Sequence, residues 1–460
     1  MKKYPKIISH VRIKNDQVRL TYFNDFFSSS YNHNFVQVIL TKSHMKPKKL
    51  TFFLASFLLI FTSCEKPRNW QDEYEPQPVF RIGVLLSLSG SGASTGQSTK
   101  VSIDLARQDI TAWLGTIGSS DRFQISIADT KTDTAEALKQ TRNFYNQGIR
   151  LVIGPYSSAE VAAIKSFADS HGILVVSPSS VAVSLAIPGD NIFRFVTSDL
   201  IEGKAMAEML LADSIRAIVP MIRNDVWGND LLKATADNFT GQGGMFNPAV
   251  KYDPKAVSFT SELALLDSTV SRLLASYNIH ELAVYLCSFG EGTAILAAAG
   301  NYPHLKMIRW YGGSAFAQNA SLLADTVASG FALSHDLPCP IFGLDETAKY
   351  KWQPLIERIQ SVLGRAPEVY ALTAYDAVWV GVKTYIYTGF RRDIAMFKSA
   401  FTTEASNYFG VTGNTTLDAN GDRAYGNYDF WAVKQIQSSR QWQVIARYNS
   451  ATGILTRLVK

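Results

Sequence analysis

Strand-like stretches alternate with helix-forming segments along most of the chain, and this alternation limits the possible fold more than any other feature. Four such stretches lie at residues 81–86, 123–129, 151–153 and 173–176. The segments between them carry apolar residues at helical spacing. Strands of a parallel sheet are buried on both faces, and helices connect them. The pattern therefore predicts an α/β fold built from βαβ units.

The alternation continues further along the chain and ends in a segment of a different kind. Further strands are predicted at Ile215–Ile222, Leu282–Leu286 and Met307–Tyr311. Apolar residues within Tyr375–Val382 recur at i, i+3, i+4 and i+7, which is typical of an amphipathic helix. Tyr428–Val433 and Trp442–Tyr448 flank Ser438-Ser439 and predict two antiparallel strands. We therefore expect a C-terminal β-hairpin appended to the α/β body.

The basic charge of the chain is confined to its N-terminal region. The 460 residues carry a formal net charge of +6. Residues 1–63 hold ten Lys or Arg and two Asp and thus carry +8, while the remaining 397 residues hold 35 basic and 37 acidic side chains. The folded body is therefore slightly acidic. This distribution gives no support to a nucleic-acid partner.

The segment from Met45 has the composition of a secretory signal. Three lysines precede the apolar stretch Leu50–Phe61, which Thr51 and Ser56 alone interrupt. Twelve helical residues reach about 18 Å, which is short of a bilayer core of about 30 Å. We therefore predict a signal peptide over residues 45–63. Residues 1–44 are interpreted as an upstream extension that is not translated, the alternative being an unusually long N-terminal region of the signal.

The end of this signal resembles a bacterial lipobox, in which a small residue precedes a cysteine that becomes lipidated. Here Ser63 precedes Cys64, and Phe61 replaces the commoner leucine. The resemblance implies that Cys64 is the lipidated first mature residue, and a multiply acylated cysteine anchors a protein stably. Residues 64–78 are polar and proline-rich, as in a tether. We expect an extracytoplasmic protein, held by lipid on the cell membrane or outer membrane and facing the periplasm.

The sequence gives no support to a nucleotide-binding, metal-binding or catalytic function. The glycines at 92 and 96 are too close for a phosphate-binding loop, and Gln97 stands where that loop needs lysine. The sequence contains no His-Glu-x-x-His, and its histidines lack metal-ligand spacing. Asp418–Asp422 resembles the start of a calcium loop, but a hairpin turn is favoured. We expect no catalytic residues, metal or cofactor, and we expect Cys287 to be a small buried apolar residue.

Six ordered segments carry a family resemblance. They are Ile82–Gly90 with Gly96-Gln97, Ala128-Asp129 with Thr132-Asp133, Ile153–Ser158, Val176–Ser180, Phe193–Phe195 and Leu417–Arg423. Together they resemble the type I periplasmic binding proteins, specifically the leucine/isoleucine/valine-binding group of ABC-transporter receptors. The similarity extends from about residue 80 to residue 450.

The resemblance implies an α/β fold of two doubly wound parallel-sheet lobes joined by three hinge crossings, with a ligand in the cleft between them. We place the crossings near Thr197, Ser329–Ser334 and Phe409–Asn414. Lobe one then comprises 79–197 plus 331–410, and lobe two comprises 198–330 plus 411–460. Elementary topology agrees, because ligands of open α/β sheets bind beyond the carboxyl ends of the strands.

Seven cleft positions follow from the resemblance: Thr95, Ser158, Ser179, Val181, Trp227, Phe289 and Ser314. Ser158 matches a serine that binds the ligand carboxylate, and the N–H groups of a helix start independently favour an anion. Helix capping alone is the alternative for this serine. Ser179 matches a backbone contact, and Trp227 and Phe289 match aromatic residues near the ligand, although core packing explains these two equally well.

Three of these positions depart from the family pattern. Ser314 replaces an acid that commonly pairs with a ligand ammonium group, Val181 replaces a threonine, and Thr95 replaces a tyrosine. A buried ammonium without a charge partner costs several kcal/mol. The departures therefore favour a carboxylate, an amide or another polar molecule between Trp227 and Phe289 over a free α-amino acid.

The resulting functional prediction is a monomeric, lipid-anchored solute-binding protein that delivers a small-molecule ligand to an ABC permease, without catalysis. The alternative is a ligand-sensing or cell-envelope regulatory module of the same fold that serves no transporter. An enzyme ranks third.

Overall fold

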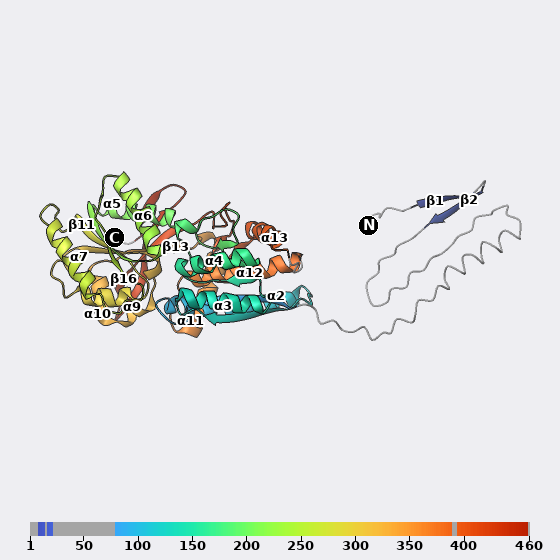
Figure 1. Cartoon of the computed structure of the whole chain (residues 1–460), viewed down its shortest axis with the longest axis horizontal. Coiled ribbons are helices and arrows are strands. Elements are labelled where there is room, and N and C mark those ends of the chain that lie inside the picture. Colours follow the sequence, from blue (N-terminus) through green and yellow to red (C-terminus); the bar gives the residue numbers. More distant parts are fainter. Residues whose placement is uncertain (1–7, 14–15, 22–78, 389–392, 459–460) are drawn as a thin grey trace. The chain divides into compact units, whose positions relative to one another are not determined.

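The computed structural model describes residues 8–13, 16–21, 79–388 and 393–458, and the chain divides into two units after Pro76. In the first unit, β1 (Ile8–Ile13) pairs antiparallel with β2 (Asp16–Thr21) (Figure 1). The predicted signal peptide, Cys64 and the tether lie outside the described residues. Of the helices that the structure describes, none has the length and apolar content to cross a bilayer.

The second unit begins with a five-stranded parallel sheet. Its strands, in the spatial order β4-β3-β5-β6-β7, are β4 (Phe123–Asp129), β3 (Phe80–Leu86), β5 (Leu151–Ile153), β6 (Leu174–Ser177) and β7 (Ile192–Arg194). Ile82 and Val84 pack toward α2 (Ala93–Thr116) and α12 (Tyr370–Thr388). Leu85 packs toward α3 (Thr134–Asn146) and α4 (Ser158–His171) on the other face. The alternation of side chains along β3 thus buries both faces of this sheet.

A second sheet of parallel strands follows. Its strands are β10 (Val250–Tyr252), β8 (Ala217–Arg223), β11 (Leu282–Cys287) and β12 (Arg309–Gly312) in spatial order, and β9 (Met245–Phe246) also pairs with β8. Its helices are α5 (Asp199–Ala212), α6 (Val226–Gly241), α7 (Thr260–Leu273), α8 (Gly292–Ala299), α9 (Ala320–Ala324) and α10 (Thr326–Ser334). The predicted α/β class with parallel sheets is confirmed.

The C-terminal hairpin is confirmed and belongs to a larger antiparallel sheet. The order of that sheet is β13 (Cys339–Gly343), β16 (Asn427–Ile436), β17 (Ser439–Asn449) and β18 (Ile454–Arg457). Helices α11 (Lys349–Leu363) and α13 (Ile394–Asn407) and the short strands β14 (Phe409–Gly410) and β15 (Gly413–Asn414) complete the chain. The segment 418–422 forms a turn, in which the Asp418 carbonyl accepts the Gly421 N–H. The hairpin-turn interpretation of this segment is therefore correct.

Several predicted element boundaries are wrong, including that of the strand predicted from Ile215, which begins at Ala217. Helix α2 begins at Ala93, four residues before the predicted Gln97. The strand predicted from Met307 begins at Arg309, because the Met307 N–H bonds the His304 carbonyl in a turn and its side chain is 52% exposed.

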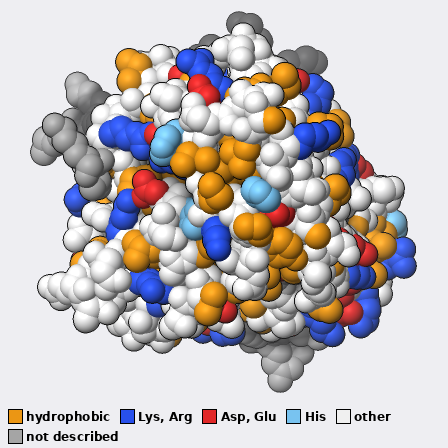
Figure 2. Space-filling view, turned by 90° about the vertical axis from the view of Figure 1, so that its left-hand side faces the viewer, with side chains coloured by type: hydrophobic (Ala, Val, Ile, Leu, Met, Phe, Trp, Pro, Cys, Tyr) orange, Lys and Arg blue, Asp and Glu red, His pale blue; other side chains and the backbone are white. Residues whose placement is uncertain are grey.

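Surface charge and thiols agree with the sequence analysis. Cys287 and Cys339 are free and buried, as predicted for Cys287. Figure 2 shows one end of the second unit, where basic and acidic side chains are interspersed around apolar ones. Basic charge is not gathered into a single patch on that face.

Candidate functional site

A small cavity lies where strands of both parallel sheets end. Its volume is about 10 Å³, room for about one water molecule. Six of the seven predicted positions line it, Thr95 being the exception. The lining residues are Tyr156, Ser157, Ser158, Ser179, Val181, Trp227, Phe289, Ser314, Ala315 and Tyr370. All of them except Tyr370, the first residue of α12, lie in segments that follow β5, β6, β8, β11 and β12, as expected for a cavity at strand ends.

Two neighbouring serines at the start of α4 have different roles, and only the first of them caps the helix. Ser157 is the N-cap residue: its Oγ accepts the Glu160 N–H at 3.2 Å, and Glu160 Oε2 accepts the Ser157 N–H at 3.0 Å. This reciprocal pair is a capping box. Ser158, one residue later, is therefore not needed as the cap.

The Ser158 hydroxyl is held in a defined orientation. Its Oγ accepts the N–H groups of Val181 and Ala182, each at 3.2 Å, and lies 2.9 Å from Ser180 Oγ. A hydroxyl has two acceptor lone pairs and one proton. Because both lone pairs are used by backbone N–H groups, the proton of Ser158 is left to donate, either to Ser180 or to an anionic ligand group.

Ser179 and Val181 contribute differently from Ser158. The Ser179 hydroxyl donates to the Tyr156 carbonyl at 2.8 Å, and the Ser179 N–H lies 3.5 Å from Ser177 Oγ, so both donors of this serine already have partners. Val181 is 3% exposed and supplies an apolar wall together with the N–H that orients Ser158.

Four aromatic rings form part of the cavity wall. The Phe289 ring centroid lies 5.1 Å from that of Trp227 and 5.3 Å from that of Tyr156, and Tyr370 is 6.5 Å from Tyr156. Such spacings are normal for tilted and edge-to-face pairs. Trp227 and Phe289 contact each other here, so a ligand enters between them only if the rings move apart.

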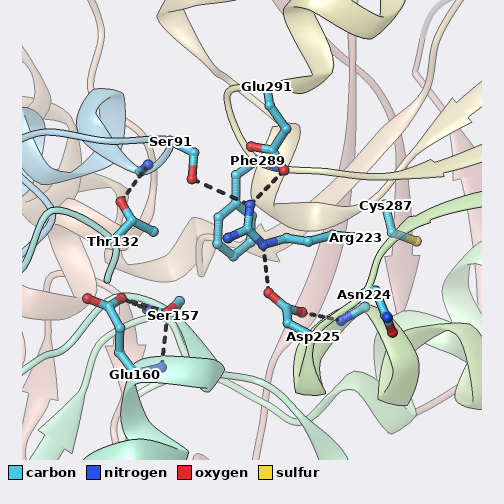
Figure 3. Close-up of polar contacts among 12 residues, drawn as sticks. Ser91, Thr132, Ser157, Glu160, Arg223, Asn224, Asp225, Cys287, Phe289 and Glu291 are labelled. Carbon is cyan, nitrogen blue, oxygen red and sulfur yellow. Dashed lines mark hydrogen bonds and ion pairs between the residues drawn. The ribbon is translucent and has the colours of Figure 1, made fainter. Parts of the chain in front are cut away.

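Arg223, at the end of β8, packs against the Phe289 ring of this aromatic group (Figure 3). Its guanidinium carbon lies 4.3 Å from the Phe289 ring centroid, and its nitrogens pair with Asp225 at 2.6 Å and Glu291 at 2.7 Å. Burial opposes the charge, but Glu291 and Asp225 outweigh it and raise the pKa of Arg223. The guanidinium therefore remains charged and holds the Phe289 ring in place.

The same cluster connects the two parallel-sheet regions. Ser91, in the loop after β3, lies with its Oγ 3.5 Å from Arg223 Nη1 (Figure 3). The Ser91 carbonyl accepts the N–H of Gly290 at 3.0 Å. These contacts connect the loop after β3 to the end of β8 and to the segment after β11, close to Phe289 of the cavity wall.

A pair of buried acids lies behind the cavity wall. Glu202 Oε1 accepts the Ser314 N–H at 2.9 Å, and both Glu202 and Asp199 have fully buried side chains. Burial raises the pKa of Glu202 to about 7. Burial, followed by the nearby Glu202 charge, raises the pKa of Asp199. The buried pair therefore retains bound protons at pH values where exposed carboxyl groups have lost them.

Thr95 lies in the first turn of α2, outside the cavity wall. It is 6% exposed and its side chain bonds Tyr156. Burial nevertheless raises the pKa of the Tyr156 hydroxyl, so it stays neutral. Thr95 reaches the cavity only through this tyrosine, because α2 starts earlier than predicted.

Several residues of the site were not predicted from the sequence, among them Tyr156, Arg223, Tyr370 and Glu202. Arg223 directly follows a predicted strand and Tyr156 lies three residues after another, so a search at strand ends was able to identify both. Tyr370 lies five residues before the predicted helical periodicity, and Glu202 lies in α5 away from any strand end. The sequence carries no local signal for these last two.

The architecture and the site agree with one known family. The family described as "Periplasmic binding protein" matches residues 79–438, well over half of the chain. The chain belongs to the periplasmic binding protein family. This periplasmic binding protein is also 27% identical over 395 residues to the uncharacterized protein MJ1266 of Methanocaldococcus jannaschii, covering 82% of this chain and 91% of that relative.

Solved structures share the fold of this periplasmic binding protein. The leucine-binding protein LivK of Thermotoga maritima is 17% identical with a TM-score of 0.67, over 83% of this chain and 99% of that one. The branched-chain amino acid binding protein LivJ of Streptococcus pneumoniae, solved with isoleucine, is 19% identical with a TM-score of 0.64, over 80% of this chain and 99% of that one. The predicted resemblance to the leucine/isoleucine/valine-binding type is confirmed.

Proposed function

We propose that this periplasmic binding protein captures a small polar ligand, an amino acid or a related molecule, and presents it to an ABC permease. The observation that supports this most directly is the meeting of six predicted positions in one cavity at the strand ends. LivJ was solved with isoleucine, which is consistent with a ligand of this kind.

Two lobes are proposed, with the cavity between them. The core around the first sheet draws on residues from Phe80 to Phe195 and again from Leu355 to Leu417. The core around the second sheet includes Phe331 and Phe342. This packing favours a second crossing after Gly343 over the predicted position at Ser329–Ser334.

The ligand is expected to carry an anionic group at one end. Ser158 has a proton to donate, and the first N–H groups of α4 favour negative charge. Ser158 and the start of α4 therefore form the proposed carboxylate end of the site.

The other end of the ligand is expected to be cationic. The acid that is missing at Ser314 is replaced by Glu202, whose carboxylate bonds the Ser314 backbone. Burial raises the pKa of Glu202 to about 7, and a nearby ammonium group would favour its ionised form. Pairing of Glu202 with a ligand ammonium group on binding would answer the objection to an amino acid drawn from Ser314 alone.

Ligand binding is proposed to stabilise the closed arrangement that the permease recognises. Contacts such as Gly290 with Ser91 join the two sides of the cavity. Shifting a population from 1:99 to 99:1 takes about 5.5 kcal/mol of differential binding. Contacts of one ligand with both sides can supply this energy. Catalysis is not required.

Location is proposed from the sequence. Lipidation of Cys64 and export by the signal at 45–63 are expected to hold the protein outside the cytoplasm, attached to a membrane by lipid only and as a monomer. Mass spectrometry of the N-terminal peptide tests this, with a diacylated, N-acylated Cys64 as the expected species.

The binding proposal is tested by calorimetric titration of amino acids, organic acids, amides and sugars into the purified protein. We expect an amino acid to bind, and Ser158→Ala to weaken it about tenfold or more, as for a hydrogen bond to a charged group. Ser166→Ala, an exposed serine on the same helix, is the matched control. Binding of a sugar alone, or equal affinity in both variants, would contradict the proposal.

A further inference from the structure

A second and much larger cavity lies on the other side of the start of α12. Its volume is about 550 Å³, within the range of about 300–1,000 Å³ that is usual for small-molecule sites. Tyr370 lines the first cavity and the preceding Val369 lines the second. The second cavity is bounded by α11, by the residues leading into α12 and by one face of the antiparallel sheet.

Three tryptophans form much of the apolar wall of this cavity. Trp352 lies on α11, Trp431 on β16 and Trp442 on β17. Trp352 Nε1 donates to the Asp345 carbonyl and Trp442 Nε1 to the Asn319 carbonyl, each at 3.0 Å. Because these N–H groups are already bonded, the two rings are fixed and present aromatic surface to the cavity.

Three arginines line this cavity, and within the described residues one of them has no carboxylate partner. Arg447 is paired with Asp429 and Glu346. Arg365 is paired with Glu368 at 3.2 Å. Arg440, in contrast, donates only to neutral groups within the described residues.

Both neutral partners of Arg440 lie in α10. Its Nη1 donates to the Thr326 carbonyl at 2.6 Å and to Ser329 Oγ at 2.9 Å. Neither partner cancels the guanidinium charge. The cavity therefore combines an aromatic wall with one uncompensated positive charge.

We propose that this cavity is a second ligand site and that it binds an aromatic organic monoanion, with the ring against the tryptophans and the carboxylate at Arg440. An arginine–carboxylate contact is charge-assisted, and an aromatic ring on fixed indole faces gains packing at little entropic cost. This site is separate from the proposed amino-acid site and does not depend on it.

A ligand in this cavity is expected to change the affinity of the first site, because the cavity is lined by residues that pack with both cores. Trp352 packs with the core of the first sheet, whereas Trp431 and Trp442 pack with the core of the second. Between the two cavities, the Val369 N–H donates to Gln318 Oε1 at 2.9 Å. A ligand that contacts both cores stabilises one relative arrangement of them, and by linkage the two ligands alter each other's affinity by the same factor.

The test uses indole-3-acetate as the probe, titrated calorimetrically into the purified protein. The neutral analogue indole-3-ethanol measures the contribution of the carboxylate. We expect indole-3-acetate to bind at least tenfold more tightly than indole-3-ethanol. We expect Arg440→Gln to weaken it tenfold or more, and Arg440→Lys, which keeps the charge, to retain most of the affinity.

Two further variants test the position of the site and control for misfolding. Val444→Glu places a like charge in the wall of the second cavity and should abolish binding, while Ser166→Ala, at an exposed position of α4, should leave it unchanged. Thermal unfolding of each variant verifies that it is folded. The proposal is overturned if millimolar indole-3-acetate does not bind. It is also overturned if Arg440→Gln and Val444→Glu leave binding unchanged.

Discussion

The backbone N–H of Ser314 donates a hydrogen bond of 2.9 Å to Glu202 Oε1, which brings a buried carboxylate directly behind the cavity wall. In the family pattern, an acid commonly stands at the position that Ser314 occupies in this sequence. In the structure, α5 supplies a carboxylate 112 residues earlier in the chain. The acid of the site has therefore moved to a different element, where burial raises its pKa.

The pH dependence of stability follows from this burial. The pKa of Glu202 is raised from 4.5 to about 7, so the folded state retains a proton that the unfolded state releases between these values. The free energy of unfolding should therefore fall as the pH rises from about 4.5 to about 7. Glu202→Gln should make this fall smaller, by up to about 3 kcal/mol between pH 4.5 and pH 8, and the raised pKa of Asp199 accounts for part of the fall that remains. Urea denaturation at both pH values measures the difference.

Glu357→Gln serves as the control for Glu202→Gln, since Glu357 is exposed on α11. Its unfolding free energy should follow that of the unmodified protein at every pH. If Glu202→Gln follows it too, the carboxylate is not buried as described.

The ion pair between Arg194 and Asp422 is buried on both sides, with side chains 0% and 3% exposed. Asp422→Asn leaves the arginine charge without its partner, and we expect a loss of about 3–5 kcal/mol in unfolding free energy. Asp237→Asn breaks the exposed pair with Lys233 and should cost less than about 1 kcal/mol. Chemical denaturation of both variants tests the contrast, which equal losses would refute.

Two glycines of α2 should respond in opposite ways to alanine. A Cβ on Gly96 would lie 1.9 Å from the Ser87 carbonyl oxygen, whereas a Cβ on Gly115 has no neighbour within 4 Å. Gly96→Ala should therefore lower the thermal midpoint markedly. Gly115→Ala should stabilise the protein by about 0.5–1 kcal/mol through helix propensity. Calorimetric scanning gives both values, and a neutral Gly96→Ala would show that the loop after β3 is not packed this closely.

Ser158→Ala should destabilise the protein even without a ligand. It removes the acceptor of the Val181 and Ala182 N–H groups, which are buried. Unsatisfied buried donors cost about 1–3 kcal/mol. Ser166→Ala, at an exposed position of the same helix, should change the unfolding free energy by less than about 0.5 kcal/mol. Urea titrations of the two variants should differ accordingly.

Much of the fold was predictable because burial on both faces leaves continuous apolar runs. Leu151–Ile153 and Phe123–Asp129 lie in the predicted strands without any shift. Boundaries such as Ala93 were missed because the first turn of α2 is polar and small, so it lacks the apolar spacing on which the prediction relied.

The site was only partly predictable for a related reason. Strand ends are visible in a sequence, and six positions chosen there share one cavity. Glu202 and Tyr370 lie on helices, and only tertiary packing brings them to the cavity wall. The second cavity has no local signal either, since Trp352 and Trp442 come from segments 90 residues apart that meet in space.

The interleaving of the two cores has a consequence for the order in which the chain becomes folded. Helix α12 covers one face of the first sheet, yet it follows the entire second sheet in the chain. During synthesis or export, the apolar face formed by β3 and β5 is covered only in part, by α2, until residues 370–388 emerge. Truncation anywhere before α12 should therefore yield an aggregation-prone chain, and the N-terminal half is a natural client for holding chaperones.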